Sequence, residues 1–368
     1  MNGQFRCPGT GVFYLVPFIS LLLTIVGPSR MSSAIEPSKN LIPETLIYWA
    51  GITGTLQSVT SPDYAIIVEK SSQHLLLYKI HDDFSLHRRF ACSTGKVKGP
   101  KLLSGDQKTP EGIYFFTQEH PEKYLSPTYG NRAFTTDYPN LLDRMNGKTG
   151  HSIWLHGTDK PLRNWDSNGC VVISNEDIDA LSPFITLNRT PFIIVEDISF
   201  LPASTAARTV AGIRRLIENW TAAIEKGSVA AYLACYQKEH KPSLSWWPRW
   251  HRVRNNFRSS ETPFSLSMEN ISVFKHRAGF VVLFDQILKV RDISMKVGFK
   301  KIYVTEYRKS YRIIGETYQS LAYKKTLKTT SHPLVGVGYY LIRKLTTEHK
   351  QSAEMKSCKI PLKRDRSS

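Results

Sequence analysis

The chain has 368 residues, which is long enough for two ordinary domains with residues left for targeting and linking segments. Hydrophobic residues make up 41% and aromatic residues 11%, which excludes a wholly disordered or fibrous chain. The net charge of +18 suits an anionic partner: nucleic acid, a membrane surface or an acidic cell-wall polymer. Five scattered cysteines without a CxxC pair, and histidines without metal-site spacing, predict neither a disulfide framework nor a metal site.

Residues 1–34 have the layout of a secretory signal peptide. An apolar, uncharged stretch at 11–26 follows a basic residue, and small residues up to Ala34 come after it. This stretch is shorter than the ~20 residues that span a bilayer, which favours a cleaved signal over an uncleaved anchor. We therefore expect residues 1–34 to be removed and the protein to be exported to the periplasm or cell envelope. Export disfavours a specific nucleic-acid partner.

Short strands with alternating apolar residues dominate residues 60–196. Ser174, which is followed by acidic residues, predicts the start of a helix. Together these elements predict one β-rich domain. The expected strands lie at 64–68, 75–77, 90–93, 112–117, 153–155, 170–173 and 190–195.

The spacing of apolar residues changes in the second half of the chain. A linker is expected at 200–207, and residues 209–320 are predicted to form a separate α+β domain, because helical spacing gives way to four alternating stretches. Residues 324–368 contain eleven Lys or Arg against three acids and predict a mostly solvated basic tail. The expected helices lie at 210–224, 229–236 and 250–257, and the expected strands at 265–274, 280–290, 295–304 and 307–316.

One pair of residues is the candidate for chemistry: His156 ends one apolar strand and Cys170 begins another. A thiol attacks an acyl carbon as the thiolate, so a reactive cysteine needs a base within hydrogen-bond reach. Two strand ends joined by a 13-residue loop can bring both side chains to one rim. Gly169 permits a sharp turn and leaves backbone amides for an oxyanion. By spacing alone a core cysteine and an ordinary polar histidine remain the alternative, and Cys92 and Cys235 are assigned to the core.

At these residues the sequence resembles the L,D-transpeptidase catalytic domain (the YkuD family) of bacterial peptidoglycan enzymes. The resemblance covers about residues 60–196. The family pattern often has histidine where Asn168 stands and arginine where Val172 stands, whereas the nucleophile and the base match. The segments that carry the resemblance are His156-Gly157-Thr158, Ser167-Asn168-Gly169-Cys170 and the Gly-Asp and Thr-Pro-Glu-Gly-Ile-Tyr motifs between Gly105 and Tyr114.

The resemblance implies a cysteine acyltransferase that acts on peptidoglycan stem peptides and uses neither a cofactor nor a metal. Transfer of the acyl group to an amine would make the protein a transpeptidase, and transfer to water would make it an L,D-carboxypeptidase. Both outcomes remain open, as does a non-catalytic wall-binding module. The implied site residues are Cys170, His156 and Gly157 for catalysis, with Gly169, Asn168 and Ser167 for the oxyanion and the substrate.

Residues 131–134 and 138–140 resemble a subgroup of this family that carries a C-terminal NTF2-like domain, some members of which are L,D-carboxypeptidases that shape helical cells. Residues 209–320 fit that added domain. The implied fold class is α+β: a β-rich L,D-transpeptidase catalytic domain followed by an α+β NTF2-like domain that binds or positions substrate. The basic tail is expected to attract an anionic wall or membrane surface through screened electrostatic attraction.

Overall fold

The computed structural model describes residues 41–46, 64–80, 85–277, 279–321 and 332–357, the last ten of them by their backbone alone. Residues 39–368 form one compact unit, and the expected signal peptide at 1–34 lies outside the described residues. None of the described helices is long and apolar enough to span a membrane.

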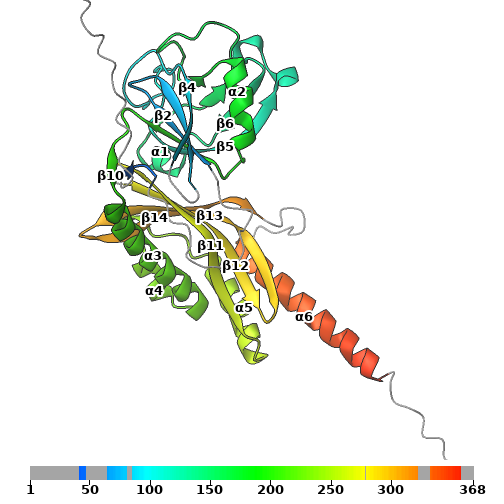
Figure 1. The fold of residues 1–368 in the computed structure, drawn as a ribbon. Coiled ribbons are helices and arrows are strands. Elements are labelled where there is room, and N and C mark those ends of the chain that lie inside the picture. Colours follow the sequence, from blue (N-terminus) through cyan, green and yellow to red (C-terminus); the bar gives the residue numbers. More distant parts are fainter. Residues whose placement is uncertain (1–40, 47–63, 81–84, 278, 322–331, 358–368) are drawn as a thin grey trace, which may run out of the picture. The chain divides into compact units, whose positions relative to one another are not determined.

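An eight-stranded mixed sheet organises the first region, and Figure 1 labels four of its strands, β2, β4, β5 and β6. The strand order is β4-β3-β2-β9-β5-β6-β7-β8. The pairs β2–β9 and β7–β8 are parallel, and the other neighbours are antiparallel. Short helices lie at Leu141–Met145 (α1) and Asn175–Leu181 (α2). The strands are Tyr64–Glu69 (β2), His74–Lys79 (β3), Ser85–Ala91 (β4), Gly112–Pro121 (β5), Arg132–Thr136 (β6), Trp154–His156 (β7), Val171–Val172 (β8) and Pro191–Val195 (β9).

Local sequence explains these elements. Ser174 caps α2 as predicted, since its hydroxyl accepts a hydrogen bond from the Asp177 amide at 3.1 Å. In β2, Ile66 and Val68 pack into one apolar cluster with α2, whereas Ile67 packs into another on the opposite face. A strand covered on both faces is expected to be continuously apolar, as β2 is.

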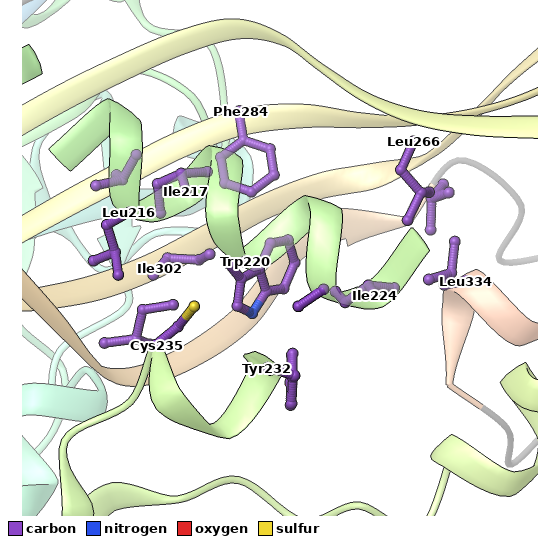
Figure 2. Packing of buried hydrophobic residues seen from close by; sticks show 14 of the residues in the cluster. Leu216, Ile217, Trp220, Ile224, Tyr232, Cys235, Leu266, Phe284, Ile302 and Leu334 are labelled. Carbon is purple, nitrogen blue, oxygen red and sulfur yellow. The ribbon is translucent and has the colours of Figure 1, made fainter. Parts of the chain in front are cut away.

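The second region is a four-stranded antiparallel sheet, β11-β12-β13-β14, with helices packed against it (Figure 1). Trp220 and Trp250 are both fully buried in its core, which Figure 2 shows around Trp220. This arrangement confirms the predicted fold class, a β-rich region followed by an α+β region. The elements are Ala203–Lys226 (α3), Val229–Ala234 (α4), Trp247–Ser259 (α5), Phe264–His276 (β11), Gly279–Val290 (β12), Ile293–Tyr307 (β13) and Ser310–Leu321 (β14).

Two segments differ from the sequence prediction. In the expected linker, Phe200–Pro202 (β10) pairs with Leu41–Pro43 (β1), and α3 begins at Ala203. In the expected solvated tail, Pro333–Ser357 forms a helix (α6) that packs against α5. The reason is a short apolar stripe at the start of α6. Its buried members are Leu334, Val335, Val337 and Leu341.

The two sheets share a hydrophobic cluster. Ile67, Phe115 and Ile193 of the eight-stranded sheet are fully buried in one cluster with Leu283 and Phe299 of the four-stranded sheet. The second region therefore covers one apolar face of the first.

Candidate functional site

At the end of the eight-stranded sheet, His156 is the last residue of β7 and Cys170 lies directly before the neighbouring strand β8. Strands β7 and β8 pair in parallel, with His156 opposite Val172, and Cys170 immediately precedes β8. The Cys170 Sγ lies 3.6 Å from the carbonyl oxygen of Ser152, just before β7. The structure thus places both predicted residues at one rim of the sheet.

His156 is held in one orientation and one tautomer. Its Nδ1 lies 2.8 Å from the carbonyl oxygen of Gly157, and because a carbonyl only accepts, Nδ1 carries the hydrogen and Nε2 is left as an acceptor. The ring of Tyr129 meets the imidazole edge-on at 5.0 Å. Burial lowers the pKa of His156, with the Gly157 hydrogen bond opposing the shift, so the imidazole is neutral and able to accept a proton at neutral pH.

The Cys170 thiol is half-buried, and its burial raises its pKa, although the backbone of Trp154 and the charge of Lys101 pull the pKa down. Because the thiol pKa is raised and the imidazole pKa is lowered, the free protein holds a neutral Cys170 thiol and a neutral His156 imidazole rather than a thiolate and an imidazolium. A base must therefore take the proton as the sulfur attacks. Cys92 is an inert contrast, because burial in the core raises its pKa to about 12.

The loop at residues 167–170, the Cys170 loop, is fixed by its own hydrogen bonds. Ser167 Oγ donates to the Cys170 carbonyl oxygen at 2.6 Å and accepts from the Gly169 amide at 3.1 Å. Gly169 has φ +126°, and a Cβ there would meet the Lys108 carbonyl oxygen at 2.8 Å, so only glycine fits. Asn168 is exposed, and its Oδ1 lies 3.4 Å from the Lys96 ammonium.

Gly157 lies in an equally close-packed turn. A Cβ at Gly157 would meet Asn175 Oδ1 at 2.4 Å, and the same oxygen accepts a hydrogen bond from the Asn131 amide at 3.1 Å. The Gly157 amide donates to the Arg132 carbonyl oxygen at 3.0 Å. The carbonyl that orients His156 is thus held by packing as well as by hydrogen bonding.

The sequence motif that contains Thr109 predicted no role for this residue. Thr109 is fully buried; its hydroxyl accepts from the Gly95 amide at 2.8 Å and donates to the Gly169 carbonyl oxygen at 3.0 Å. Lys101 was also missed: its ammonium is buried and pairs with Asp106 at 2.6 Å. The Thr-Pro and Gly-Asp motifs were the available signals, and their roles require the three-dimensional contacts.

Comparisons with known proteins find relatives of the first region. Residues 63–194 match the sequence profile of the L,D-transpeptidase catalytic domain, YkuD. This segment of the chain therefore matches the family of L,D-transpeptidase catalytic domains. YafK of Escherichia coli (strain K12) is 30% identical over 159 residues, which span 40% of this chain and 60% of YafK.

Two solved structures are similar over both regions. Bd1075 of Bdellovibrio bacteriovorus has 26% sequence identity and a TM-score of 0.61, and the match covers 77% of this chain and 99% of Bd1075. The helical cell shape determining protein Pgp2 of Campylobacter jejuni has 20% identity and a TM-score of 0.54, over 74% of this chain and 95% of Pgp2. The second likeness concerns the fold alone. Both matches extend beyond the catalytic domain.

Proposed function

We propose that this protein is an exported cysteine acyltransferase that modifies peptidoglycan, an L,D-transpeptidase-type enzyme acting on tetrapeptide stems. The observation that carries the proposal is the Gly157 carbonyl, which fixes the His156 tautomer with Nε2 as acceptor, while Cys170 immediately precedes the neighbouring strand β8. The net charge of +18 supports attraction to an anionic polymer in the envelope.

In the proposed reaction, His156 Nε2 takes the proton of Cys170 as the sulfur bonds to the carbonyl carbon that follows the L-centre of the diamino acid. The carbonyl oxygen becomes an oxyanion. The Gly169 amide already donates to Ser167, whereas the Cys170 amide has no acceptor among the described residues. We therefore assign the stabilisation of the oxyanion to the Cys170 amide. The carbon–nitrogen bond then breaks, D-alanine leaves with the proton from His156, and a thioester remains on Cys170.

The thioester has two possible acceptors. An amine of a second stem yields a cross-link and makes the protein a transpeptidase, whereas water yields a tripeptide and makes it an L,D-carboxypeptidase. Both routes use the same cysteine and histidine, so the acceptor alone decides the product.

Product analysis tests the proposal. The mature chain, residues 35–368, is incubated with a purified disaccharide-tetrapeptide and the products are identified by mass spectrometry. A 3-3 cross-linked dimer identifies a transpeptidase and a tripeptide identifies a carboxypeptidase, and Cys170→Ser should yield neither. Cys92→Ser is the matched control and should leave the product unchanged. Unaltered tetrapeptide with folded protein would leave a non-catalytic wall-binding module as the function and refute the proposal.

A further inference from the structure

Glu111 carries a buried carboxylate that is paired with a cation from each region of the fold. One of its oxygens lies 2.8 Å from the buried ammonium of Lys70, which directly follows β2, and the other lies 2.7 Å from the guanidinium of Arg277, in the turn between β11 and β12. Burial by itself would raise the pKa of the Glu111 carboxyl group. The two cations lower the pKa by more than burial raises it, so the net shift is downward and the carboxylate is ionised. A carboxylate removed from water is stable only with such partners.

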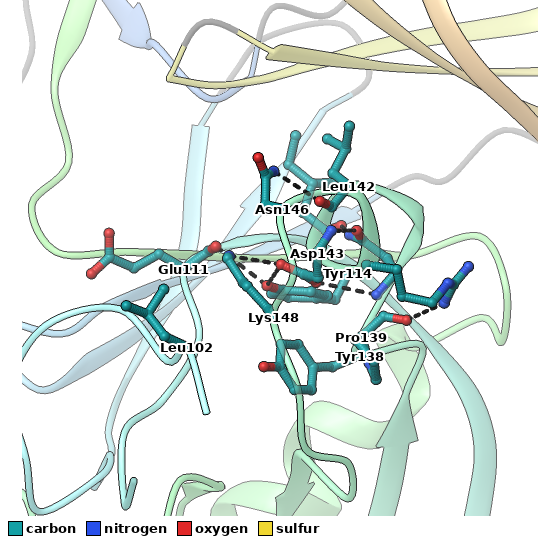
Figure 3. Close-up of polar contacts among 12 residues, drawn as sticks. Leu102, Glu111, Tyr114, Tyr138, Pro139, Leu142, Asp143, Asn146 and Lys148 are labelled. Carbon is teal, nitrogen blue, oxygen red and sulfur yellow. Dashed lines mark hydrogen bonds and ion pairs between the residues drawn. The ribbon is translucent and has the colours of Figure 1, made fainter. Parts of the chain in front are cut away.

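Glu111 lies two residues after Thr109, which holds the Cys170 loop through the Gly169 carbonyl. The proline between them has a fixed φ, so a displacement of Glu111 is transmitted to Thr109 with little slack. Figure 3 shows the Glu111 carboxylate pointing away from the cluster around Tyr114, while the Glu111 carbonyl oxygen lies 3.3 Å from the Tyr114 hydroxyl. The hydrogen bond with Tyr114 thus uses the Glu111 backbone, and the side-chain carboxylate binds the two cations.

A second cation of the second region, Lys301, is linked to β5, the strand that directly follows Glu111. Lys301 of β13 lies 2.6 Å from Asp137, whose other carboxylate oxygen accepts from the Phe115 amide in β5 at 2.9 Å. Lys301 is buried, so its removal would leave a cavity and the half-buried Asp137 carboxylate without its cation. The Arg277 side chain is 65% exposed, and Glu111 keeps Lys70 without it. Arg277 is therefore the contact that can be removed without threatening the fold.

We infer that Arg277 is a positioning residue for the nucleophile: its ion pair with Glu111 steadies the Thr109 segment and, through Gly169, keeps the Cys170 loop in the arrangement that presents the thiol to His156. The inference rests on the proposed role of Cys170. It assigns to the second region a direct effect on the reactivity of the site.

The test measures the rate at which iodoacetamide alkylates Cys170 at pH 7 in the mature chain, with the site located by peptide mass spectrometry. This reaction reports the nucleophile without any peptidoglycan substrate. Arg308→Ala is the matched control, because Arg308 is exposed in the β13–β14 turn with φ 48°, close to the 56° of Arg277. Arg277→Ala should slow alkylation roughly threefold to tenfold, which converts to about 0.7–1.4 kcal/mol of barrier. Arg277→Lys should restore most of the rate, and Arg308→Ala should not change it.

A His156→Ala background separates positioning from a general structural effect. If Arg277 acts by presenting Cys170 to His156, Arg277→Ala adds no further loss once His156 is absent. Alkylation of Arg277→Ala at the wild-type rate, or an equal loss in both backgrounds, would overturn the inference while leaving the proposed function intact. If His156→Ala itself reacts as fast as wild type, the proposed function fails and the inference fails with it.

Discussion

Replacing Thr109 by valine should destabilise the protein and weaken the nucleophile together. Valine keeps the shape of threonine but removes a fully buried hydroxyl that serves two backbone groups, the Gly95 amide and the Gly169 carbonyl. Each buried polar group left without a partner costs about 1–3 kcal/mol, so the two together should lower the free energy of unfolding by about 2–4 kcal/mol once the gain from the added methyl group is allowed for. Because Gly169 directly precedes Cys170, the His156-dependent alkylation rate should fall as well.

The assay is urea unfolding followed by tryptophan fluorescence, combined with alkylation of Cys170 by iodoacetamide. Thr117→Val is the matched control, since Thr117 lies in β5, the strand that follows Thr109, with an exposed hydroxyl that bonds to Thr135. It should change the free energy of unfolding by no more than about 0.5 kcal/mol. If Thr109→Val unfolds at the same urea concentration as Thr117→Val and keeps the wild-type alkylation rate, then Thr109 does not hold the Cys170 loop.

Three further outcomes follow from the site and from the sequence. The value of kcat/KM should fall with acid through a midpoint below 6.5, because burial lowers the pKa of His156 and its Nε2 must be unprotonated to act as base; a midpoint above 6.5 in a pH–rate profile would contradict this. Cys92→Ser should react with iodoacetamide as wild type does while Cys170→Ser loses the modified peptide, since the Cys92 thiol is buried and has a pKa of about 12. Deleting residues 358–368 removes four basic residues and one acid, so co-sedimentation with peptidoglycan should weaken at low salt while turnover of a soluble muropeptide is kept; unchanged sedimentation would show that this segment is no anchor.

Spacing alone left His156 and Cys170 as one possibility beside a core cysteine and an ordinary polar histidine, and the resemblance to the L,D-transpeptidase family decided for the pair. The structure places His156 at the end of β7 and Cys170 immediately before the adjacent strand β8. The role of Thr109 was not predictable in the same way. Its two partners, Gly95 and Gly169, lie 14 and 60 residues away along the chain, and no local pattern encodes such contacts.

Most strands of both sheets were predictable from alternation, although β6 was not predicted and β4 begins earlier than expected. The tail shows the limit of composition. Charge dominates residues 324–368, so the segment was expected to be mostly solvated. Four apolar residues at the start of α6 are nevertheless buried against the rest of the second region, because a short stripe is enough to dock a helix on an existing core. The same reasoning applies at 200–207, where α3 begins on residues that resemble a linker.

The shared cluster between the two sheets bears on whether the catalytic domain can stand alone. The sequence predicts that residues 209–320 fold separately, so that a chain ending near Phe200 would keep a reactive Cys170. The structure favours the opposite outcome, because Ile67, Phe115 and Ile193 are fully buried in a cluster that the second region completes. Uncovering three such side chains costs up to about 5–9 kcal/mol, which is comparable with the entire stability of an ordinary domain. A chain ending at Phe200 should therefore aggregate or bind a hydrophobic dye, and its Cys170 should lose the His156-dependent alkylation rate. A soluble fragment that unfolds cooperatively and is alkylated at the rate of the mature chain would show that this apolar face does not need its cover.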